Sequence, residues 1–157
     1  MYSRCYCCAR ILASDLWHLT SGTMISHHAA LIYTMVLCSA SDRNMTDAEL
    51  ETIGDTISHL PIFKDYDRKL LPQTASACAE LLDLEDGLDK ALEMIRKALP
   101  EKLRETAYAL ACDVVASDPR PSQEELRMLE LIRHGLEIDR LAAAGIERGA
   151  RAHYMRM

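Results

Sequence analysis

Two stretches of this chain decide its fold: residues 40–50 read ASDRNMTDAEL and residues 116–126 read ASDPRPSQEEL. Both begin with Ala-Ser-Asp, continue after three further residues with a hydroxyl residue, and end in Glu-Leu. A duplicated helix-turn-helix unit is the simplest explanation of this recurrence. In each copy, Thr46 or Ser122 is followed three residues later by Glu, which is the signature of a capping box at a helix start. Each stretch therefore predicts a tight turn between two helices.

Helical spacing continues outward from both turns. Apolar residues recur three and four positions apart over most of the chain, which is typical of helices with one face against a core. Pro61 and Pro119 end two of these helices, and Pro72 and Pro100 lie in the first turns of two others. We therefore predict an all-α fold, a compact bundle of about seven helices with an internal duplicated helix-turn-helix unit.

The helices at the two ends of this pattern have expected bounds. The first begins near His27 and is expected to end near Asp42, with an apolar face toward the core. The last is expected to run from about Asp139 through Ile146.

Residues 1–23 differ in composition from the rest of the chain, since they hold half of the cysteines and the single tryptophan. We expect residues 1–23 to be a poorly structured extension and residues 24–157 to form the domain. A chain of 157 residues with 49 % hydrophobic composition is long enough for one domain with its own core.

Composition and charge exclude several classes of protein. A net charge of −6 and a pI near 5.5 argue against nucleic-acid binding, which needs a basic face. No stretch reaches the roughly 18 apolar residues of a membrane span, so we expect no membrane insertion. The six cysteines do not recur at disulfide-framework spacings, which favours reduced thiols and a cytoplasmic protein.

Besides the repeated turns, the chain has a second acidic stretch, from Asp83 to Glu93. We expect this stretch to be a solvent-exposed face.

The repeated turns supply candidate metal ligands. Asp42 lies seven residues before Glu49, and Asp118 seven residues before Glu125, so each turn can direct two carboxylates into one small space. Hard divalent cations such as Ca²⁺, Mg²⁺ and Mn²⁺ prefer several oxygen ligands in such a loop. The alternative is that these acids only cap helices and bond to turn amides. The segment is no EF-hand, because it lacks the central glycine and its glutamate comes too early.

No other motif predicts catalysis or an organic cofactor. The chain has no HExxH, no nucleophile elbow, no phosphate loop and no dinucleotide fingerprint, so we expect a protein that is not an enzyme. Cys5, Cys7 and Cys8 with His18 match no paired zinc pattern, and an unstructured leader explains them better. Cys38, Cys78 and Cys112 lie within apolar helical patterns and are expected to be core residues.

At the two repeated turns the chain resembles the tellurite-resistance TerB family and its relatives, including the N-terminal domain of DjlA-like membrane co-chaperones. The similarity runs from about Met24 to Tyr154. It is clearest in LIYTMVLCSASDRNMTDAELETIG (31–54) and in LPEKLRETAYALACDVVASDPRPSQEELRMLELI (99–132). The chain departs from the family at Arg43 and Pro119, where the family usually has glycine after the aspartate.

The resemblance implies a compact all-α fold and a cytoplasmic protein of the tellurite or general stress response. It also implies an acidic surface proposed to bind divalent cations, at Asp42, Glu49, Asp118 and Glu125 in this sequence. The leading hypothesis is a non-enzymatic stress-response module that binds a cation at these turns and an unknown partner protein, in the setting of a membrane-associated stress complex.

Two rival hypotheses stay open. The first is a metal-independent, co-chaperone-like helical adaptor whose acidic turns are only helix caps. The second is an enzyme that acts on tellurium oxyanions through an exposed, activated cysteine, for which only the leader cysteines Cys5, Cys7 and Cys8 qualify.

Overall fold

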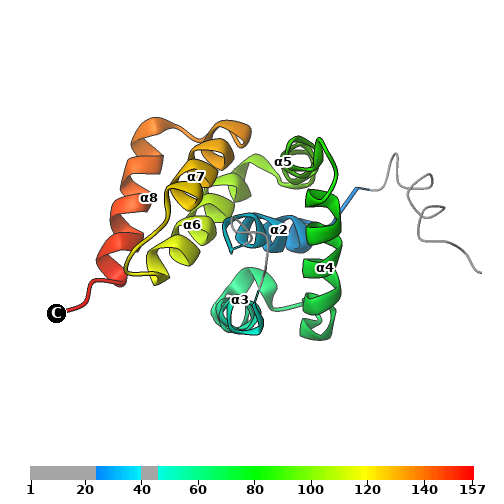
Figure 1. The fold of residues 1–157 in the computed structure, drawn as a ribbon, viewed down its shortest axis with the longest axis horizontal. Coiled ribbons are helices and arrows are strands. Elements are labelled where there is room, and N and C mark those ends of the chain that lie inside the picture. Colours follow the sequence, from blue (N-terminus) through cyan, green and yellow to red (C-terminus); the bar gives the residue numbers. More distant parts are fainter. Residues whose placement is uncertain (1–23, 40–45) are drawn as a thin grey trace, which may run out of the picture.

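The computed structural model describes residues 24–39 and 46–157, and these residues form helices joined by short turns, with no strand among them (Figure 1). The α-helices of the described residues are α2 (His27–Ser39), α3 (Asp47–His59), α4 (Leu71–Leu82), α5 (Gly87–Ala98), α6 (Glu101–Ser117), α7 (Gln123–Gly135) and α8 (Arg140–His153). Two short 3-10 helices, η2 (Pro61–Phe63) and η3 (Arg68–Leu70), connect α3 to α4. The prediction of an all-α fold with about seven helices is confirmed.

Helix α2 lies at the centre of the molecule. It contacts α3, α4, α5, α6 and α7, and every residue from Ala30 to Ser39 is buried (Figure 1). The sequence predicted a helix with one face toward the core, whereas α2 is buried all round. A helix that is apolar on every side belongs in the interior, and here neighbouring helices cover each of its faces. The hydroxyl of Thr34, near the middle of α2, donates to the Ala30 carbonyl at 2.9 Å, so this buried polar group has a hydrogen-bond partner.

Proline and capping residues set most helix ends as predicted. Helix α3 ends at His59, two residues before Pro61, and α6 ends at Ser117, two residues before Pro119. Pro72 lies in the first turn of α4, and Pro100 is the N-cap of α6. These positions suit a residue that fixes φ and lacks an amide donor.

Helix α8 is longer than predicted. It extends to His153 rather than Ile146, and it packs along α6 at the edge of the molecule (Figure 1). The apolar pattern fades after Ile146 because α8 contacts the core through small residues, and Ala143 and Ala150 are its buried positions. The interface with α6 therefore defines a helix whose second half has little apolar periodicity.

Three predictions concern residues outside the described part of the chain. They are the extension at residues 1–23, the end of the first helix near Asp42, and Asp42 itself as a metal ligand. The duplication of the two helical hairpins stays a prediction from sequence. None of the helices within residues 24–39 and 46–157 has the length and apolarity needed to cross a membrane.

Candidate functional site

Both repeated turns lead into helices with complete capping boxes. At the start of α3, Thr46 Oγ1 accepts from the Glu49 amide at 3.3 Å, and Glu49 Oε2 accepts from the Thr46 amide at 2.6 Å. At the start of α7, Ser122 Oγ accepts from the Glu125 amide at 3.1 Å, and Glu125 Oε2 accepts from the Ser122 amide at 2.6 Å. The predicted boxes are confirmed, and they fix both glutamates in the same local geometry.

The N-termini of α3 and α7 line one cavity. A cavity of about 180 Å³ lies between the α3 N-terminus, the C-terminal ends of α2 and α6, and the α7 N-terminus. We call it the turn cavity, and the residues that line it are Ser39, Glu49, Thr52, Ile53, Val114, Ser117, Asp118 and Glu125. The structure thus brings together three of the four acids that the sequence singled out, from segments far apart in the chain.

Each of the three acids uses one oxygen to stabilise its own turn. Glu49 and Glu125 accept through Oε2 in the capping boxes, and Asp118 Oδ1 accepts from the Arg120 amide at 2.8 Å. Among the described residues, the other oxygen of each carboxylate accepts no hydrogen bond. Capping and ligand binding are therefore compatible, because a carboxylate has two oxygens and several lone pairs.

The described acids do not form a complete metal shell. In the part of the chain that the structure describes, no three side chains of His, Cys, Asp or Glu lie close enough together to hold a metal ion by themselves. An ion in the turn cavity would need water ligands or a further group besides Glu49, Asp118 and Glu125. The cavity wall also includes Ser39 and Thr52, which sequence reasoning missed because neither belongs to the repeated motif.

A buried thiol lies beneath this acidic wall. Burial above all, and then the neighbouring Cys112 and Glu125, raise the pKa of the Cys38 thiol. Ser39, which follows Cys38 at the C-terminal end of α2, lines the turn cavity together with Glu125. Cys38 is therefore a protonated core residue rather than a metal-binding thiolate.

The other described cysteines are equally inert. Cys78 and Cys112 are free and buried, as predicted, and burial raises the pKa of each thiol to about 12. A reactive cysteine needs a lowered pKa and access to solvent. None of the three described cysteines meets either condition.

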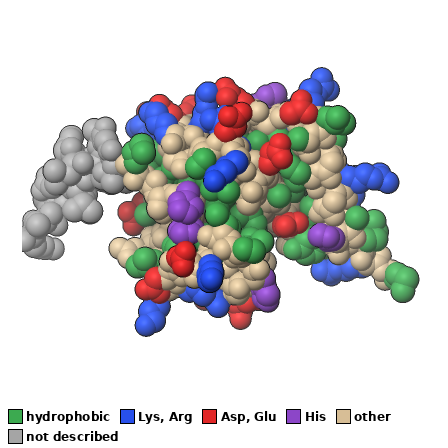
Figure 2. Space-filling model, turned by 180° about the vertical axis from the view of Figure 1, so that it is seen from behind, with side chains coloured by type: hydrophobic (Ala, Val, Ile, Leu, Met, Phe, Trp, Pro, Cys, Tyr) green, Lys and Arg blue, Asp and Glu red, His purple; other side chains and the backbone are tan. Residues whose placement is uncertain are grey.

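The surface drawn in Figure 2 carries charges of both signs. Lys and Arg side chains are interspersed with Asp and Glu there, and they do not gather into one basic area. Phosphate-backbone binding depends on a continuous basic face. The face in Figure 2 does not provide one.

Comparison of the sequence with models of protein families, with curated proteins and with solved structures finds no match.

Proposed function

We propose that this protein is a non-enzymatic helical module that holds a divalent cation in the turn cavity and thereby orders a surface for a partner protein. The observation that supports the proposal is the convergence of Glu49, Asp118 and Glu125 on one cavity of about 180 Å³. Each of these acids has a carboxylate oxygen that is not used in capping by any described residue. Negative groups that share a small space favour a cation between them.

The incomplete set of protein ligands among the described residues leads us to expect a partly hydrated ion in this cavity. Mg²⁺ usually keeps several water ligands and binds through one or two carboxylates, whereas Ca²⁺ takes six to eight oxygens. Since the described acids alone make no complete shell, Mg²⁺ is the first ion to test, with Ca²⁺ and Mn²⁺ beside it. Asp42, the fourth predicted ligand, belongs to the same proposal from the sequence motif.

The stress-response part of the proposal rests on the resemblance to the TerB family. That resemblance supports a cytoplasmic protein that acts with a partner in a membrane-associated stress complex. The bound cation would stiffen the turn between α6 and α7 and the start of α3. Such stiffening would favour a surface that the partner recognises.

The second candidate function is a metal-independent helical adaptor. The observation that favours it is the double capping box, because the hydrogen bonds of Glu49 and Glu125 already explain why a glutamate stands at each position. Under this hypothesis the turn cavity stays without a cation.

Two pairs of substitutions separate these functions. Gln at the third helical position preserves a capping box, so Glu49→Gln with Glu125→Gln removes charge and keeps the caps. Thr46→Ala with Ser122→Ala removes the hydroxyl caps and keeps both carboxylates. The measurement is the melting temperature of each variant with and without millimolar Mg²⁺, Ca²⁺ or Mn²⁺.

Cation binding predicts that the wild type and the Thr46→Ala/Ser122→Ala variant both gain stability from metal, whereas the Gln variant does not. At 100 times its dissociation constant a ligand adds about 2.7 kcal/mol, which is roughly 5–10 °C for a chain of this size. If none of the three ions shifts the melting temperature of the wild type, the cation proposal is rejected and the adaptor is favoured.

A further inference from the structure

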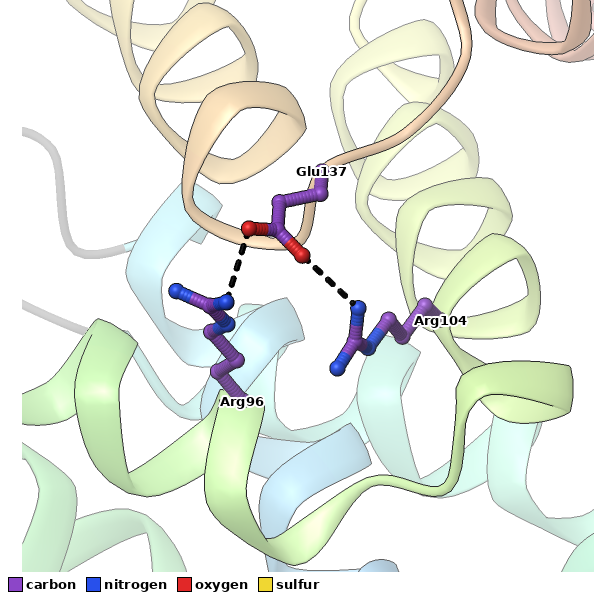
Figure 3. A network of polar contacts seen from close by, with 3 residues as sticks. All are labelled: Arg96, Arg104 and Glu137. Atoms are coloured by element: carbon purple, nitrogen blue, oxygen red, sulfur yellow. Dashed lines mark hydrogen bonds and ion pairs between the residues drawn. The ribbon is translucent and has the colours of Figure 1, made fainter.

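A second polar cluster lies at the opposite end of α7 from the turn cavity. Figure 3 shows Glu137, in the turn between α7 and α8, pointing between Arg96 of α5 and Arg104 of α6. Arg96 Nη2 donates to Glu137 Oε1 at 2.7 Å, and Arg104 Nη1 donates to Glu137 Oε2 at 3.2 Å. We call these three residues the arginine clasp.

The backbone holds Glu137 in place for this contact. The Glu137 amide donates to the His134 carbonyl, and the Ile138 amide donates to the Arg133 carbonyl, which is the Schellman arrangement at a helix C-terminus. Glu137 has φ of 57°, in the left-handed region where glycine is usual. An unfavourable backbone position that carries a long acidic side chain indicates that the side chain compensates for it through its two arginines.

The clasp contains more donors than its acceptor can satisfy. It has two guanidinium groups and one carboxylate, and no other carboxylate of the described chain forms an ion pair with either arginine. Arg104 Nε is buried and has no hydrogen-bond partner in the structure described. Its Nη1 bond is also long for a charged pair. Glu137 is thus divided between two arginines and leaves the more buried one incompletely satisfied.

Exposure decides which arginine can change partner. The side chain of Arg104 is 22 % exposed, whereas Arg96 is 49 % exposed and open to solvent. If an external anion bound Arg96, Glu137 would be free to turn fully toward Arg104. Its two carboxylate oxygens could then accept from the two Nη groups of Arg104, in the paired geometry that guanidinium prefers. The hydrogen bonds gained at Arg104 would offset the ion pair lost at Arg96.

We propose that Arg96 is an oxyanion-binding residue whose internal partner, Glu137, is exchanged for an external phosphate or carboxylate group. The ligand is a small oxyanion or an acidic group on a larger molecule, since guanidinium recognises both by the same paired hydrogen bonds. Binding would lock the turn between α7 and α8 onto α6 by completing the Arg104–Glu137 pair. This site is independent of the cation proposed for the turn cavity.

The test is a titration of the whole chain with inorganic phosphate and, separately, with acetate, each compared with chloride at the same ionic strength. We expect phosphate, acetate or both to raise the melting temperature above its value in chloride. The rise should be lost in Arg96→Gln. The matched control is Arg127→Gln, which breaks an exposed Arg127–Glu130 pair of 2.7 Å on α7 and should keep the rise.

A second measurement on the unsubstituted chain follows the guanidinium Nη–H resonance of Arg104 by NMR. The exchange predicts that the anion moves this resonance toward a hydrogen-bonded position and slows its exchange with water. The proposal is overturned if neither anion exceeds chloride, if Arg96→Gln responds like the wild type, or if the Arg104 Nη–H resonance does not change on titration.

Discussion

Tyr108 connects α6 to α8 through a partly buried hydrogen bond. Its side chain is 1 % exposed, and its hydroxyl donates to Glu147 Oε1 at 2.7 Å. Burial first, and then the Glu147 acceptor, raise the pKa of this phenol well above its usual range. The hydroxyl therefore stays protonated and serves as a donor for a partly buried carboxylate.

Replacing Tyr108 by Phe removes that donor and leaves the Glu147 carboxylate without it. We expect a loss of about 2 kcal/mol in the free energy of unfolding, the usual range for a hydrogen bond to a charged group. Urea denaturation measures the loss. Tyr154→Phe is the control, because Tyr154 is 40 % exposed, and it should change stability by much less. Equal effects of the two substitutions would contradict this role for Tyr108.

Asp113, also on α6, predicts a pH dependence. Burial raises the pKa of its carboxyl, and the nearby His153 partly opposes that effect. A raised pKa means that the folded state binds the proton more tightly than the unfolded chain, so the ionised group weakens the fold at neutral pH. This penalty disappears as the pH falls through the raised pKa toward the ordinary value of Asp, about 4.

Asp113→Asn should therefore be more stable than the wild type at neutral pH, and the difference should shrink to nothing by about pH 4. Urea denaturation at several pH values measures it. A stability difference that does not depend on pH would show that the effect comes from packing and not from the charge.

At the scale of the element, two glycines in helices should respond to substitution in opposite directions. A Cβ added at Gly145, inside α8, would meet no atom within 4 Å. A Cβ added at Gly87, at the start of α5, would lie 2.0 Å from the Leu81 carbonyl oxygen. Among the described residues Gly145 therefore avoids no steric clash, whereas Gly87 lets the α4–α5 turn close.

We expect Gly145→Ala to raise the free energy of unfolding by about 1 kcal/mol, through helix propensity alone. Gly87→Ala should lower it by at least as much, because the turn backbone must move. Thermal unfolding of both variants under the same conditions measures the contrast. If Gly145→Ala lowered the free energy of unfolding, a neighbouring group would have to contact the outer face of α8 at this position.

The elements that sequence predicted well are those set by local chemistry. The capping boxes at Thr46 and Ser122 and the proline at the start of α4 depend on a few adjacent residues. The all-round burial of α2 and the true end of α8 depend on which helices pack against them. Periodicity within one segment does not contain that information.

The arginine clasp is a second feature that local sequence patterns could not predict. Glu137 stands where a glycine would have marked the end of α7, and its partners Arg96 and Arg104 lie 41 and 33 residues away in the chain. No local pattern links these three residues. Only the packing of α5 and α6 beside the turn explains why an acid occupies that position.

At the scale of the whole molecule, Glu49 at the start of α3 meets Asp118 and Glu125 of the α6–α7 turn at one cavity. The sequence predicted Glu49, Asp118 and Glu125 as a functional set, but it did not predict whether the turns lie together or on opposite faces. That answer depends on the central position of α2, between α3 and the α6–α7 pair. Helix α7 then runs from the turn cavity to the arginine clasp, roughly 18 Å apart along its axis.

The central claim is that Glu49 and Glu125, from the two turns, hold the same cation. Paramagnetic Mn²⁺ broadens NMR signals of nearby amides, so a titration of the ¹⁵N-labelled chain measures this most directly. We predict that the amides of Glu49, Asp118 and Glu125 broaden together at the lowest Mn²⁺ concentration and recover when Mg²⁺ is added in excess. Broadening at one turn without the other, or first in the acidic stretch from Asp83 to Glu93, would contradict the claim.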